Sequence, residues 1–149
     1  MVIFGPQVQE IGDMAFEGSQ YLRGVAFDVG LKRIGSYAFA RCKNIEALAL
    51  MVEEIGVGSF SECERVSLID IGPKITSIPD NAFYRTGSKA IGELKLLNGF
   101  SGNLKRIGKS AFEETPLREV IIPETMESVS ERAFYECRQL EKITISART

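Results

Sequence analysis

Hydrophobic positions recur along the chain in one frame that repeats about every 23 residues. The most regular part reads Ile-Gly-x-x-Ala-Phe and occurs, with variations, in six copies. The copies are separated by 23, 21, 23, 29 and 22 residues, so the chain is an array of repeats. Their last residues are Phe16, Phe39, Phe60, Phe83, Phe112 and Phe134.

A second apolar pattern follows each phenylalanine. In the fifth copy it consists of Leu117, Val120 and Ile122, and the alternation of its last two residues predicts a short strand with these side chains inward. A turn and a further apolar pair lead into the next copy. In the fourth copy the equivalent strand residues are predicted to be Ile91, Leu94 and Leu96.

The position four residues before each phenylalanine is Gly, Pro or Ser. Because Pro79 occupies it and proline cannot take a positive φ, the recurring glycine is not expected to form a left-handed turn. All three residue types suit the start of a short helical turn. A repeat of this length cannot enclose its own core, but stacked copies bury equivalent side chains in continuous ladders.

The frame resembles that of the BspA-like leucine-rich repeat family, known from bacterial surface proteins and many protist proteins. The clearest match is LREVIIPETMESVSERAFYEC at residues 117–137, and the resemblance covers essentially the whole chain. It implies a leucine-rich-repeat solenoid over residues 1–149, α/β or mainly β. This would be a right-handed, curved stack of about six repeats with short helical turns and a parallel sheet on its concave side. It further implies a non-enzymatic role in protein recognition or adhesion, without catalytic residues.

Composition narrows the possible chemistry. The chain has no histidine, which removes the usual general base and the commonest zinc ligand, so no enzyme and no cofactor are expected. Its 18 basic and 20 acidic residues are interspersed, which argues against a nucleic-acid binder. No run approaches the roughly 20 apolar residues of a membrane span, and residues 1–13 do not read as a secretion signal. The compartment, and whether the chain is a fragment of a longer array, stay open.

The three cysteines raise the question of a metal or redox site. However, Cys42, Cys63 and Cys137 all stand three residues after a ladder phenylalanine, in a position that also accepts serine or threonine. This indicates a small side chain able to hydrogen-bond the backbone of a neighbouring coil, and a structural, buried thiol. Stacked parallel side chains also fit disulfide geometry poorly. The other copies have Ser19, Thr86 and Thr115 at this position.

Two other features carry weaker signals. The basic pairs at 32–33 and 105–106 share one phase, but acidic or neutral residues separate them, which favours a mixed solvated face over a phosphate-binding track. Residues 97–103, LNGFSGN, form the largest break in the pattern, and Ser101 has neither nucleophile-elbow spacing nor a histidine to activate it. Leu104 already fills the next apolar position, so Phe100 either folds back over the break or projects as a contact.

The outward strand positions form the candidate interaction surface, with a protein or peptide as its expected partner. They vary where the core is uniform, although solvent-facing filler also varies. One column contains Leu68, Glu93, Glu119 and Lys142, the other Asp70, Lys95, Ile121 and Thr144, and Phe100 is added from the break. The alternative is a structural spacer or self-assembling unit that associates end to end, because the chain begins and ends in apolar, strand-like segments.

Overall fold

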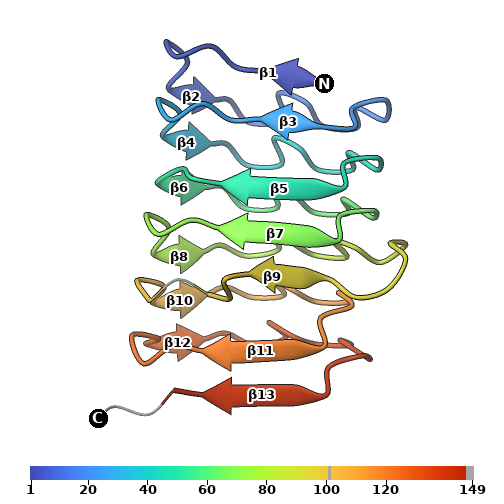
Figure 1. Cartoon of the computed structure of the whole chain (residues 1–149), viewed down its shortest axis with the longest axis vertical. Coiled ribbons are helices and arrows are strands. Elements are labelled where there is room, and N and C mark those ends of the chain that lie inside the picture. Colours follow the sequence, from blue (N-terminus) through green and yellow to red (C-terminus); the bar gives the residue numbers. More distant parts are fainter. Residues whose placement is uncertain (101, 147–149) are drawn as a thin grey trace.

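The computed structural model describes residues 1–100 and 102–146, so Ser101 lies outside the described residues. Successive coils stack along one axis from the N-terminal to the C-terminal end, and each described coil but the last contributes one strand to each of two faces (Figure 1). The predicted solenoid with parallel strands is therefore confirmed.

The odd-strand face contains the strands that the L-x-x-I-x-I pattern predicts. It is divided into three sheets, β1-β3, β5-β7-β9 and β11-β13, all with parallel pairing. Its strands are β1 (Val2–Ile3), β3 (Val25–Ala26), β5 (Ala47–Leu50), β7 (Leu68–Ile71), β9 (Lys95–Leu97), β11 (Glu119–Ile122) and β13 (Lys142–Ile145).

The even-strand face is built from the short extended segment of each repeat. These two-residue strands pair in parallel as β2-β4-β6 and β8-β10-β12, a second ladder that the hydrophobic pattern did not predict. They are β2 (Glu10–Ile11), β4 (Arg33–Ile34), β6 (Glu54–Ile55), β8 (Ser77–Ile78), β10 (Arg106–Ile107) and β12 (Ser128–Val129).

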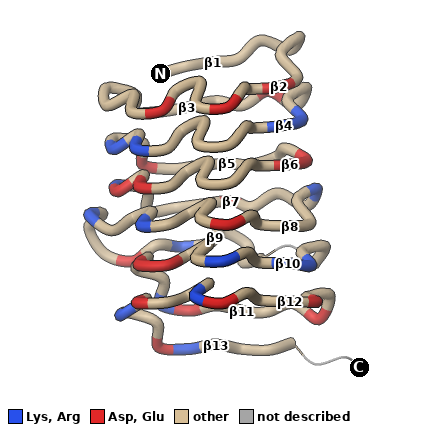
Figure 2. Tube along the Cα trace, turned by 180° about the vertical axis from the view of Figure 1, so that it is seen from behind, with Lys and Arg blue, Asp and Glu red and all other residues tan. Residues whose placement is uncertain are grey.

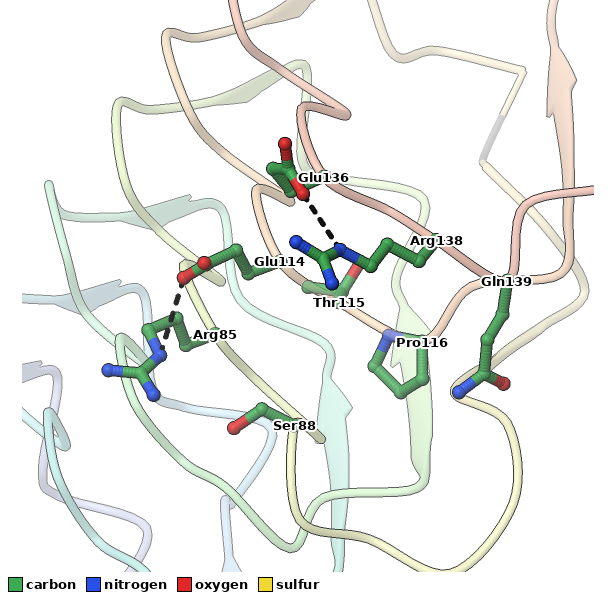
Figure 3. A pocket seen from close by; sticks show the side chains of 8 residues that line it. All are labelled: Arg85, Ser88, Glu114, Thr115, Pro116, Glu136, Arg138 and Gln139. Carbon is green, nitrogen blue, oxygen red and sulfur yellow. Dashed lines mark hydrogen bonds and ion pairs between the residues drawn. The ribbon is translucent and has the colours of Figure 1, made fainter.

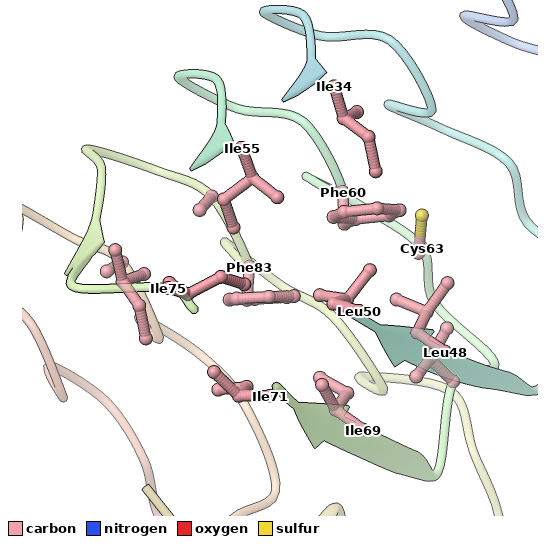
Figure 4. Packing of buried hydrophobic residues seen from close by; sticks show 14 of the residues in the cluster. Ile34, Leu48, Leu50, Ile55, Phe60, Cys63, Ile69, Ile71, Ile75 and Phe83 are labelled. Atoms are coloured by element: carbon pink, nitrogen blue, oxygen red, sulfur yellow. The ribbon is translucent and has the colours of Figure 1, made fainter. Parts of the chain in front are cut away.

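The six ladder phenylalanines form one aromatic column through the interior. Neighbouring rings are stacked with centroids 5.1 to 5.8 Å apart. Figure 4 shows the Phe60 and Phe83 rings lying parallel, with isoleucine and leucine side chains from both faces around them. The four interior rings are completely buried, so the predicted shared core is confirmed.

Around each ladder phenylalanine the chain makes hydrogen-bonded turns, and no α- or 3₁₀-helix occurs in the described ranges. The residues two before and two after the phenylalanine take positive φ, as with Ser110 (55°) and Glu114 (57°) beside Phe112. Amides of the turns also donate to the next coil, as from Phe83 N–H to Ala111 O at 2.8 Å. The turns that the sequence predicted as helical thus contain left-handed corners. Hydrogen bonds between the turns of successive coils form a third ladder.

The recurring glycine serves close approach between coils, and its φ is not positive, as predicted. A Cβ on Gly35 would lie 2.6 Å from the backbone nitrogen of Asp13, and one on Gly56 would lie 2.4 Å from that of Ser36. Such distances are far inside van der Waals contact, so the backbones of adjacent coils could not approach this closely with a side chain there.

Charged residues are interspersed over the coils, with basic and acidic positions mixed along both edges of the stack (Figure 2). On the even-strand face Arg33 forms ion pairs with Glu10 at 3.5 Å and Glu54 at 3.1 Å, which joins three coils. The basic pair at 32–33 therefore lies in the mixed face that its sequence context predicted. No described helix has the length and apolar character required to cross a bilayer.

Candidate protein-interaction face

The cysteine position is structural. Cys42, Cys63 and Cys137 donate hydrogen bonds to the carbonyl of the ladder phenylalanine in the preceding coil, with sulfur–oxygen distances of 3.2, 3.1 and 3.0 Å. The three thiols are free, and the described residues contain no cluster of metal-ligating side chains. Burial raises the pKa of Cys42 to about 11 and that of Cys63 well above its ordinary value, which disfavours the reactive thiolate.

The fourth repeat differs from its prediction. Ile91 is fully exposed on the loop between Thr86 and β9 and takes no part in a strand. The strand register places Lys95 beside Leu68 and Leu97 beside Asp70. Both predicted columns were therefore wrong by two residues in this coil, because the strand begins two residues later than the pattern predicted. Lys95 belongs to the first column, Leu97 to the second, and Glu93 precedes both.

Phe100 folds back into the core, the first of its two predicted alternatives. Its side chain is 7% exposed, and its ring centroid lies 5.6 Å from that of Phe112, twelve residues later. Phe27 contacts Phe39 across the same separation. Phe100 thus packs on Phe112 as Phe27 packs on Phe39, and its buried side chain offers little surface to a partner.

The strand ladder is interrupted between β9 and β11. One isolated bridge joins Leu94 to Leu117, both buried. Extending that register by three residues would place Leu97, which is 46% exposed, opposite the buried Val120. A parallel pair cannot place an outward residue opposite an inward one, so the ladder stops after the bridge. β9 then ends in a turn at Asn98 and Gly99, both at positive φ, which leads Phe100 into the core.

A surface hollow of about 390 Å³ lies at this interruption, between β9 and β11. Four of the predicted interaction residues line it, namely Glu93, Lys95, Glu119 and Ile121. The remaining lining residues are Leu94, Leu96 and Gly99. The structure therefore brings these residues together around one depression, whereas the sequence had assigned them only to two columns.

The charged side chains of this face form only long ion pairs. The Lys95 ammonium lies 3.9 Å from the Glu93 carboxylate, and Lys142 lies 3.9 Å from Glu119. Contacts of this length between exposed side chains contribute at most about 1 kcal/mol each. Because Lys95 and Glu119 stand on opposite sides of the interruption, each has its ion-pair partner on its own side. These side chains can reorient toward a partner at little cost.

Two further hollows adjoin the fourth repeat. One of about 400 Å³ lies where β5 and β7 begin and includes Ile91 and Lys89 of the inserted loop. Another of about 390 Å³ lies where they end and includes Asn98 and Asn103. The insertion thus creates depressions near both ends of β9. The sequence signal for them was the 29-residue spacing of this copy.

A smaller hollow of about 230 Å³ lies on the turn side of the last coils (Figure 3). Its charged residues are paired with one another. Arg85 contacts Glu114 at 3.4 Å, and Arg138 contacts Glu136 at 2.8 Å. This internal neutralisation makes it a weaker candidate site for a charged ligand than the depression between β9 and β11.

Comparison with known proteins agrees with this architecture. The profile of the BspA type leucine-rich repeat region matches in six copies, over residues 1–98 and 88–149. A search of curated proteins gave no match.

Among solved structures, a leucine-rich cell surface protein from Faecalibacterium prausnitzii A2-165 is 27% identical, with a TM-score of 0.84. The alignment covers 97% of this chain and 38% of that protein. A leucine-rich repeat protein from Bacteroides ovatus ATCC 8483 is 19% identical with a TM-score of 0.58, and shares the fold. The alignment covers 97% of this chain and 48% of that protein, so the chain spans less than half of either structure. With six profile matches across its whole length, the chain belongs to the BspA-type leucine-rich repeat family.

Proposed function

We propose that this chain is a non-enzymatic protein-recognition module that binds a protein or peptide through the C-terminal half of its odd-strand face, in an adhesion-type contact. The observation that carries the proposal is the depression between β9 and β11, lined by Glu93, Lys95, Glu119 and Ile121. Its volume is within the range of ligand sites, and it combines apolar groups with opposite charges. The surface location of the similar Faecalibacterium protein supports a role in contact with other molecules.

The neighbouring residues extend this surface. Leu97 and Ile121, each 46% exposed, give apolar contact area beside the charged column of Lys95, Glu119 and Lys142. Apolar side chains flanked by charges are typical of interfaces in which the apolar groups supply affinity and the charges supply orientation. In the first coils the same columns consist of small residues such as Ala47 and Ala49, which offer less contact area.

The test compares two charge swaps. Mass spectrometry would identify the proteins that the immobilised wild type retains and the double variant Lys95→Glu, Glu119→Lys does not. The affinity of wild type and variants for each purified partner would then be measured. The matched control is Arg106→Glu, Glu127→Lys, which reverses an exposed ion pair of 3.2 Å on the coil edge that carries β10. We expect at least about tenfold weaker binding for the first swap only. Equal affinity of all three proteins would contradict the proposal.

A second candidate function, end-to-end assembly, is favoured by the exposure of β13. Ile143 and Ile145 occupy inward strand positions but are 55% and 75% exposed. Among the described strands, β13 pairs only with β11. Sedimentation equilibrium over a range of concentrations tests this function. A mass that rises with concentration and returns to that of a monomer in Ile143→Thr, Ile145→Thr supports assembly, and a strict monomer argues against it.

A further inference from the structure

The backbone of β11 has an open edge that faces the depression. In a parallel sheet, successive residues direct their N–H and C=O groups to alternate neighbouring strands. The carbonyls of Arg118 and Ile122 accept hydrogen bonds from the β13 coil, from Glu141 and Ser146, each at 2.9 Å. The amide groups of Val120 therefore also face β13, whereas those of Glu119 and Ile121 face β9.

No described residue of β9 pairs with this edge. Among the described residues, the backbone pairing between these two coils on the odd-strand face is limited to the bridge at Leu94 and Leu117, which precede β9 and β11. There Leu94 N–H donates to Pro116 O at 3.0 Å. Beyond the bridge, Leu96 O accepts from Gly99 N–H, so the end of β9 is closed by its own turn. The backbone N–H and C=O groups of Glu119 and Ile121 thus face the hollow, with no described strand beside them.

The hollow matches the needs of an extended chain. About 390 Å³ is near the lower end of the volumes of ligand sites, which suits a few residues of an extended peptide. Leu94 and Leu96 are inward-facing residues of the lining, and Lys95 and Glu119 lie on opposite sides. An extended segment alternates its side chains, so one set can face the leucines while the other lies between the two charges.

We propose that the depression binds an extended segment of a partner protein as an added strand, through main-chain hydrogen bonds to Glu119 and Ile121. This inference rests on the proposed function and specifies its partner: a segment in strand conformation with alternating apolar and polar residues. Binding by strand addition draws affinity from the backbone and specificity from alternate side chains.

The probe is a set of heptapeptides selected from a random phage-displayed library on the immobilised chain, then synthesised. Ile121→Pro removes an N–H that faces the depression and leaves the β13 pairing in place, since proline is tolerated where the N–H points away from the ladder. The matched control Ile121→Thr keeps that N–H. We expect about tenfold weaker peptide binding for Ile121→Pro and less than about threefold for Ile121→Thr.

N-methylation of the peptides gives a readout that does not depend on the folding of a variant. If the peptide adds to the edge of β11, methylating alternate amides abolishes binding and methylating the intervening ones does not. Uniform tolerance of N-methylation, or failure to select any peptide, would overturn strand addition. If the Lys95→Glu, Glu119→Lys swap weakens peptides that tolerate N-methylation, recognition occurs by side chains alone and the proposed function still stands. Insensitivity to both changes would contradict both proposals.

Discussion

The thiol of Cys63 donates a hydrogen bond to the backbone carbonyl oxygen of Phe39, 3.1 Å away in the preceding coil. One coil further, the hydroxyl of Thr86 makes the equivalent bond to Phe60 at 2.8 Å. These buried side chains link successive coils through hydrogen bonds to the backbone of the ladder phenylalanines. The interchange of cysteine and threonine at one position therefore reflects a shared donor, and neither metal binding nor redox chemistry is needed to explain it.

This bond predicts the outcome of replacing Cys63. Cys63→Thr keeps a donor, and we expect the free energy of unfolding to change by less than about 1 kcal/mol. Cys63→Val has a similar volume but no donor, and we expect it to cost about 1 to 2 kcal/mol because the carbonyl loses its partner. Urea unfolding measures both. Equal stability of the two variants would show that the position requires size alone.

The aromatic column predicts a gradient of stability along the stack. Phe83→Ala removes a completely buried ring stacked between Phe60 and Phe112, and we expect it to cost about 3 to 5 kcal/mol. Phe134→Ala, at a half-buried ring with Phe112 as its stacking partner, should cost clearly less. Equilibrium unfolding in urea compares them. Equal losses would mean that the coils do not share one continuous core.

The fourth repeat gives a prediction that separates the structure from the sequence pattern. Phe100→Ala should lower the free energy of unfolding by about 3 kcal/mol, because the buried ring packs against Phe112. Ile91→Ala should change it by less than about 0.5 kcal/mol, since the side chain is fully exposed. Thermal and urea unfolding provide the measurement. The reverse order would restore Ile91 to the core.

Burial of the thiols predicts a loss of stability at high pH. Desolvation raises the pKa of Cys42 from 9.0 to about 11, so above pH 9 the unfolded chain releases a proton that the folded chain retains. The contribution is fully present below pH 9 and is lost as the pH rises toward 11. The urea midpoint of the wild type should therefore fall more steeply between pH 9 and 11 than that of Cys42→Ser. Parallel curves would contradict a raised thiol pKa.

The sequence by itself determined the repeat, the inward strand positions outside the fourth coil, and the role of the small residue three positions after each ladder phenylalanine. These are properties of a local frame, because stacking equivalent residues is the one way in which units of this length bury their apolar side chains. Gly35 and Gly56 were also correctly placed outside left-handed turns. The left-handed corners beside each phenylalanine were missed, since residues as different as Ser110 and Arg132 adopt them.

The tertiary structure decided the fourth coil and, with it, the candidate site. The periodic pattern offered Ile91 as a strand residue and left Phe100 without a position, whereas in the stacked coils Ile91 is exposed and Phe100 packs against Phe112. The register of β9 against β7, and its mismatch with β11, also appear only when the coils are stacked. The depression exists because strand pairing demands agreement of inward and outward residues across neighbours far apart in sequence, which no single repeat encodes.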